Sequence, residues 1–110
     1  MINDTAPEKL LALYLSLPQT PSRLSRHDRK LAQQLIERNT PTELIEAAML
    51  LAIARRSFRD PSLPPLGSIR SFHYFLPVIE EVLSTGVSSD YVHYLRQKLA
   101  PFLEKAAESK

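Results

Sequence analysis

Apolar residues recur along this chain at the three- and four-residue spacing of amphipathic helices, and no stretch of strand length alternates between apolar and polar positions. The pattern predicts five helices: one from Asp4 or Thr5 to before Pro18, one from Ser25 to about Arg38, one that opens at Thr40-Pro41, one from Ile69 to Ser84, and one after Ser88. The third helix is apolar nearly all round from Leu44 to Ala54. We therefore predict an all-α, compact bundle around this buried central helix, with Leu51 in the core.

Residues that cap or break helices mark several of these boundaries. Ser25 and Asp28 have the spacing of a capping box, and Thr40 with Glu43 repeats it before the third helix. Pro77 lies inside the fourth helix and removes one backbone donor, which predicts either a kink or a restart at that point.

The whole chain, residues 1–110, is expected to form a single helical domain. Gly86 is predicted to cap the fourth helix in the left-handed conformation, and residues 106–110 are expected to fray. The chain has no cysteine, which excludes disulfides and cysteine-ligated zinc. Because neither a secretory signal nor an apolar run of membrane-spanning length is visible, a cytoplasmic protein without membrane contact is expected.

Basic residues concentrate in the middle of the chain. Thr20 to Arg59 contains eight basic and four acidic residues, whereas the residues after Ser71 carry a net charge of −1. Four arginines lie at two helix ends that a proline-rich loop joins, and we predict that they form one basic surface: Arg55, Arg56, Arg59 and Arg70. A second group extends this surface if the second helix packs beside the loop: Arg26, Arg29 and Lys30.

Such a surface is suited to DNA phosphates, which lysine and arginine neutralise without reading sequence. The same arginines are equally suited to stabilising a helix C-terminus and pairing with nearby carboxylates, and the residues alone favour neither role. Four ring-bearing residues follow the loop, from Phe72 to Phe75. Consecutive helical positions point about 100° apart, so some of these rings are expected in the core, while His73 or Tyr74 is predicted to stack on the bases of a single strand.

The predicted first helix has an unusually wide apolar face, formed by Leu10, Leu11, Tyr14, Leu15 and Leu17. This face predicts a homodimer or a docking site for another protein, although a small bundle can also bury it internally. No catalytic motif is present, the three histidines are isolated from other ligand types, and adjacent Glu80 and Glu81 diverge on a helix. We expect neither an enzyme nor a bound metal or cofactor.

The segment from Thr40 to Tyr91 resembles the C-terminal helical domain of DnaD/DnaB-like primosomal replication proteins. Tyr74 matches the aromatic residue that opens a helix in that family, Val78 stands at its isoleucine position, and Val82 stands where the family has tryptophan. Gly86-Val87-Ser88-Ser89 is similar to the turn into the last helix of that domain.

This resemblance implies a DNA-associated accessory module in replication initiation or in the replication of a mobile element. We expect binding to single- or double-stranded DNA with little sequence specificity, and contacts with replication proteins. The alternative is a helical protein–protein interaction module of a replication or transposition complex that makes no direct contact with DNA. The salt dependence of DNA binding distinguishes the two, because phosphate contacts give a steep slope.

Overall fold

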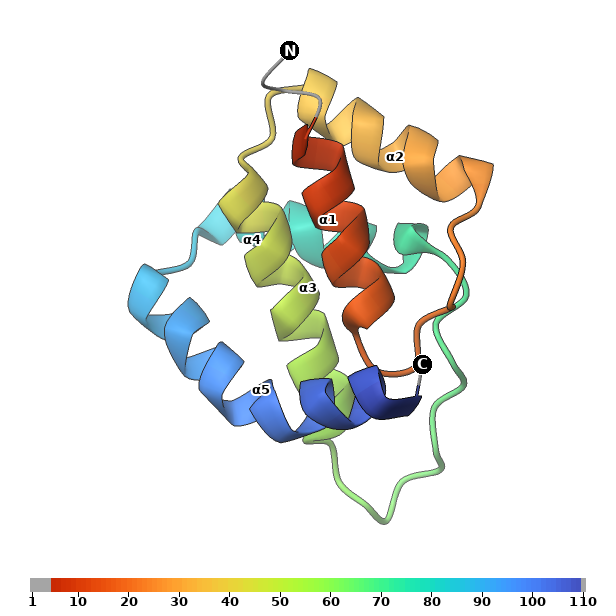
Figure 1. The fold of residues 1–110 in the computed structure, drawn as a ribbon. Coiled ribbons are helices and arrows are strands. Elements are labelled where there is room, and N and C mark those ends of the chain that lie inside the picture. Colours follow the sequence, from red (N-terminus) through yellow and green to blue (C-terminus); the bar gives the residue numbers. More distant parts are fainter. Residues whose placement is uncertain (1–4, 110) are drawn as a thin grey trace.

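The computed structural model describes residues 5–109, which form an all-α bundle without strands (Figure 1). Its elements in chain order are α1 (Thr5–Ser16), α2 (Arg26–Glu37), α3 (Thr42–Ser57), the short 3-10 helix η2 (Phe72–Phe75), α4 (Leu76–Thr85) and α5 (Ser89–Ser109). The predicted fold class is confirmed. No helix among these residues is both long and apolar enough to cross a membrane.

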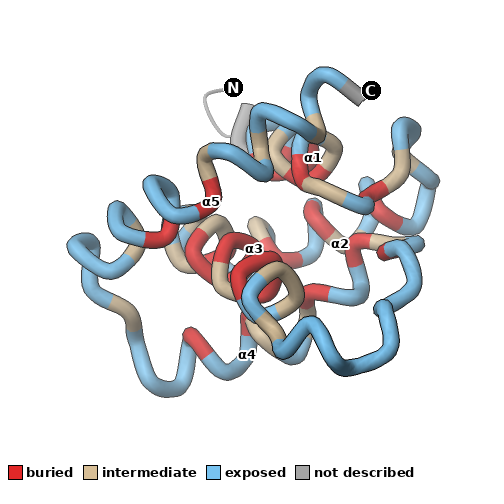
Figure 2. Tube along the Cα trace, turned by 90° about the horizontal axis from the view of Figure 1, so that it is seen from below, coloured by how far each residue is buried: buried red, intermediate tan, exposed pale blue. Residues whose placement is uncertain are grey.

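Helix α3 is the centre of the bundle, as its sequence predicted. It packs against α1, α4, α5 and η2, and its buried residues are Ile45, Ala47, Ala48, Met49, Leu50, Ala52, Ile53 and Ala54. Figure 2 shows these buried positions gathered along α3, while the outer sides of the surrounding helices are exposed. Leu51 packs against the core but is only half-buried, so its predicted place in the core is met only in part: it also lines an open hollow between α3, α4 and the start of α5.

The wide apolar face of α1 lies inside the bundle. Leu10, Leu11, Tyr14 and Leu17 are buried, and half-buried Leu15 packs against the same core. The Tyr14 ring meets two rings of η2 edge-on, with centroids 5.5 Å from Phe72 and 5.9 Å from Phe75. Of the predicted alternatives, internal burial is the one that the structure shows: α2, α3, α5 and η2 cover this face within one chain, so it is not available to a second copy or a partner.

Capping residues behave as predicted at α2 but not at α3. Ser25 and Asp28 exchange backbone-to-side-chain bonds of 3.0 Å each, which completes the capping box. At α3 the N-cap is Pro41, and no side chain caps the helix. Thr40 is not the N-cap, because the first backbone bonds of α3, from Leu44 and Ile45, go to the Pro41 carbonyl; the Thr40 N–H itself donates to the Leu35 carbonyl in α2.

The segment predicted as a fourth helix from Ile69 to Ser84 divides at Pro77. Ile69 to Ser71 is not helical, η2 follows, and α4 restarts at Leu76 with Pro77 in its first turn. A proline is tolerated there because the first turn of a helix leaves its N–H groups unpaired in any case. Of the two predicted alternatives, the restart is the one that occurs.

Gly86 ends α4 with a positive φ of 78°, as expected, but its ψ of 170° lies outside the left-handed helical region that we predicted. Its N–H donates to the Val82 carbonyl over 2.7 Å. The Ser88 hydroxyl then accepts from the Tyr91 N–H over 3.1 Å and caps α5 as predicted. Helix α5 continues to Ser109, so residues 106–109 are not frayed; Lys110 lies outside the described residues.

Candidate nucleic-acid interface

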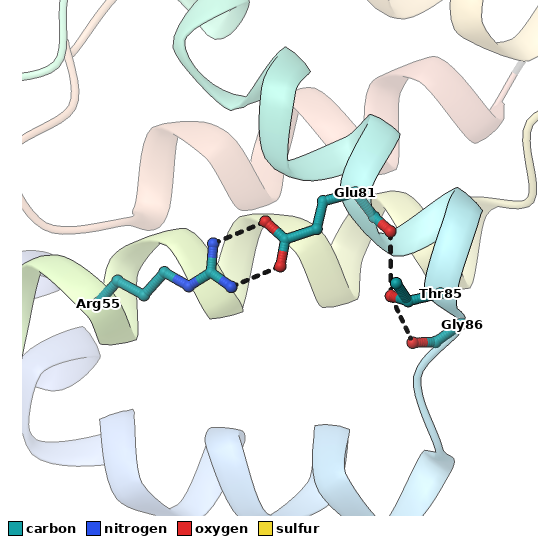
Figure 3. A network of polar contacts seen from close by, with 4 residues as sticks. All are labelled: Arg55, Glu81, Thr85 and Gly86. Atoms are coloured by element: carbon teal, nitrogen blue, oxygen red, sulfur yellow. Dashed lines mark hydrogen bonds and ion pairs between the residues drawn. The ribbon is translucent and has the colours of Figure 1, made fainter.

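Arg55, the first arginine of the predicted basic surface, is paired with a carboxylate. Its guanidinium donates to both carboxylate oxygens of Glu81 on α4, over 2.9 and 2.6 Å, as Figure 3 shows. This hydrogen bond lowers the pKa of Glu81 and raises that of Arg55. Both side chains are about half exposed, at 51% and 45%. Because a carboxylate compensates its charge, Arg55 is a poor ligand for DNA phosphates.

Arg56, the next residue on α3, holds the proline-rich loop in place. Its guanidinium donates to the Gln19 side-chain oxygen over 2.6 Å, to the Gly67 carbonyl, and to the Tyr74 hydroxyl over 3.0 Å. The guanidinium carbon also lies 5.4 Å from the centre of the Tyr74 ring. These contacts join the end of α3 to three other segments of the chain, so Arg56 has a structural role that the sequence did not reveal.

Arg59 also turns back on the loop, where it donates to the Pro64 carbonyl over 2.6 Å. Arg55 and Arg56 line one hollow and Arg56 and Arg59 line another, whereas Arg70 lines neither. Arg70 is exposed and makes no hydrogen bond or ion pair with any residue in the described part of the chain. The predicted grouping of these four arginines is therefore only partly realised.

The second basic group lies along α2, where Arg26, Arg29 and Lys30 are all exposed. Positions three and four residues apart are neighbours on a helix, so these three side chains share one face. None of them makes an ion pair with a described residue.

A buried carboxylate determines what lies beside this face of α2. Asp28 is 2% exposed, and in addition to capping α2 it accepts the N–H of Phe72 over 2.9 Å. This bond fixes the start of η2 against α2. His27, Lys30, Ser71 and His73 consequently line one shallow hollow. Helix α2 thus packs beside η2 rather than beside the proline-rich loop.

We call the resulting patch the α2–η2 surface and define it by Arg26, His27, Arg29, Lys30, Arg70 and His73. All six residues are exposed, and Arg70 is assigned to the patch from its position in the chain, two residues before the anchored Phe72. Asp28 is the acidic residue at the centre of this patch, but it faces inward to the Ser25 and Phe72 amides. The patch therefore carries four outward cations and two histidines.

The two residues predicted to stack on bases, His73 and Tyr74, have different surroundings in the structure. His73 is exposed and belongs to the α2–η2 surface, as the sequence predicted for an outward-facing ring. Tyr74 is 42% exposed, but Arg56 holds its hydroxyl and Phe75 contacts its ring edge-on at 5.3 Å. Of the four consecutive rings, Phe72 and Phe75 are the ones in the core.

Comparison with protein-family models, with curated proteins and with solved structures finds no match to this chain. The resemblance of residues 40–91 to primosomal proteins stays a prediction. Two further features of the structure were not predicted from the sequence.

One missed feature is a pair of exposed rings on α5, Tyr91 and Tyr94, which stack with their centroids 6.1 Å apart. Their three-residue spacing on a helix was a signal that could have found them. A second is the long-range role of Asp28, for which the local sequence carries no signal. Within residues 5–109 no group of three or more histidines and carboxylates could hold a metal ion.

Proposed function

We propose that this chain is a DNA-associated module that binds phosphates through the α2–η2 surface, with little sequence specificity. The observation that carries the proposal is that Arg26, Arg29, Lys30 and Arg70 are exposed and lack carboxylate partners among the described residues. The Asp28–Phe72 bond brings the two chain segments that carry them together.

The chemistry of these side chains favours phosphate over base recognition. Each arginine presents a planar fork of N–H donors that matches phosphate oxygens, and Lys30 supplies a mobile point charge. Contacts of this kind position DNA without reading its sequence. Exposed His73 offers one ring beside the cations, which suits stacking on an unpaired base.

A role in replication initiation or in the replication of a mobile element rests on the resemblance of residues 40–91 to primosomal proteins. The α2 part of the α2–η2 surface, with Arg26, Arg29 and Lys30, supports DNA contact independently of that resemblance, since α2 lies outside the resembling segment.

The decisive experiment is a salt titration of DNA binding by the Arg26→Ala, Arg29→Ala, Lys30→Ala triple variant. Alanine is a good helix former and all three positions are exposed, so the variant is expected to keep the fold. Affinity for a fluorescein-labelled oligo(dT) and for a random-sequence duplex is measured between about 50 and 200 mM salt. Loss of three phosphate contacts is expected to weaken binding and to make the slope of log affinity against log salt shallower, by about 2.7 for the duplex and about 2.1 for oligo(dT).

A matched control removes the same charge from α5, in an Arg96→Ala, Lys98→Ala, Lys105→Ala variant. This control variant is expected to keep most of the wild-type slope of log DNA affinity against log salt concentration. Equal losses in the two triple variants would show that net charge, and not the α2–η2 surface, determines binding. An unchanged slope in the α2 variant would contradict the proposal and favour the protein-interaction alternative.

A further inference from the structure

The hollow that Arg56 and Arg59 line lies away from the α2–η2 surface, where the proline-rich loop folds over the end of α3 and the later part of α5. The cavity has a volume of about 560 Å³, which falls in the range of ligand-binding pockets. Its lining combines apolar and polar residues, and the apolar ones include Pro18, Ile53, Pro61, Leu63, Leu66 and Phe102. Leu63 and Leu66 remain 47% and 45% exposed, which leaves apolar surface available to a ligand.

The loop side of this pocket is held by specific hydrogen bonds, while α3 and α5 form the rest of its walls. Arg56 holds the Gly67 carbonyl, Arg59 holds the Pro64 carbonyl, and the Ile69 N–H donates to the Gln19 carbonyl over 2.8 Å. The several prolines of the loop further reduce its freedom. A preorganised pocket of this kind loses little entropy when a ligand binds.

The charge of the pocket is positive. Arg56 and Arg59 both line it, and their hydrogen bonds go to neutral carbonyl, amide and hydroxyl groups. Asp60 is the one carboxylate in the lining, and it accepts the Ser62 N–H over 2.9 Å. A guanidinium has five N–H donors, and Arg59 uses one of them on Pro64, so donors remain for an incoming carboxylate.

We propose that this pocket binds a short acidic and apolar peptide segment of a partner protein. A leucine or phenylalanine side chain enters the aliphatic floor, and a neighbouring carboxylate pairs with Arg59. Single-stranded DNA fits less well, because Phe102 is the one ring in the lining and already meets Phe58 edge-on at 5.5 Å. Arg56 and Arg59 are also only two cations for a chain of phosphates, and Arg56 already holds three neighbouring groups. The proposal is independent of DNA binding, since the pocket and the α2–η2 surface share no residue.

The test is fluorescence anisotropy of the full chain with a fluorescein-labelled Gly-Ser-Asp-Leu-Phe-Asp peptide. Two further peptides, with asparagine for both aspartates or serine for Leu-Phe, are each expected to bind at least about tenfold more weakly. Arg59→Gln removes the charge but keeps a donor for Pro64, and Leu63→Ser removes apolar surface at an exposed position. Each variant is expected to weaken peptide binding about tenfold or more.

Arg38→Gln is the matched control, because Arg38 is exposed at the end of α2 and lies outside the pocket. It is expected to bind the peptide like wild type. The proposal is overturned if the wild-type chain shows no binding up to about 1 mM peptide, or if Arg38→Gln and Arg59→Gln weaken it equally. It is also overturned if Arg59→Gln abolishes oligo(dT) binding while peptide binding is unchanged, since the pocket would then serve DNA.

Discussion

Asp28→Ala is expected to destabilise the domain by more than a lost helix cap alone. The buried carboxylate accepts the Ser25 N–H over 3.0 Å and the Phe72 N–H over 2.9 Å. Loss of a capping interaction costs about 1 kcal/mol. Phe72 is fully buried, so its unpaired N–H adds about 1–3 kcal/mol. The expected decrease in the free energy of unfolding is therefore about 2–4 kcal/mol.

Urea unfolding followed by circular dichroism measures this decrease directly. With a denaturant dependence of about 1–3 kcal/mol per molar urea, a loss of about 3 kcal/mol lowers the midpoint by about 1–3 M. Ser25→Ala isolates the capping box, because Ser25 makes no bond to Phe72, and it is expected to cost about 1 kcal/mol. Equal losses in Ser25→Ala and Asp28→Ala would refute the role assigned to the Phe72 bond.

The same residue connects the stability of the domain to the DNA binding that we propose. If the bond from the Phe72 N–H to Asp28 holds Arg70 beside α2, then Arg70→Ala weakens DNA binding in the wild-type chain but has little effect in a folded Asp28→Ala variant, which lacks the acceptor. The two single variants and the double variant form a double-mutant cycle whose coupling term is expected to differ from zero. Additive effects on affinity would show that the two segments contact DNA independently.

Two further perturbations test the polar groups of the bundle. Tyr14→Phe is expected to raise the free energy of unfolding by about 1 kcal/mol, because the buried hydroxyl has no hydrogen-bond partner among the described residues. The melting temperature should therefore rise by about 4 °C. A lower melting temperature would contradict this account. Arg55 lowers the pKa of Glu81, so the folded chain binds fewer protons there than the unfolded chain. The pair's stabilisation is full above the ordinary carboxyl pKa of about 4.3 and disappears as the pH falls through the lowered value. The stability difference between wild type and Glu81→Gln should therefore shrink on acidification, and a difference that stays constant from neutral to acidic pH would refute the assignment.

Local patterns in the sequence were sufficient to predict the five α-helices and their order along the chain. The all-round apolar run from Leu44 to Ala54 predicted the central helix because every side of it has to be covered. The Ser25–Asp28 capping box was visible because both of its bonds form within one turn. The same local logic limited Pro77 to a kink or a restart, since the loss of one backbone donor acts at that residue.

The partners of the polar side chains were decided by tertiary packing. An arginine at a helix end has the same local sequence whether it faces solvent or, as for Arg55, meets Glu81 from another helix. The apolar pattern on α1 would be the same whether this face formed a dimer interface or an internal core. Only the positions of the neighbouring helices distinguish the two cases. Asp28 combines the two cases: its capping bond forms within α2 and was predicted, but its bond to Phe72 joins residues far apart in the chain. Contacts at such separations depend on how the helices pack, which the spacing of residues along the chain does not specify.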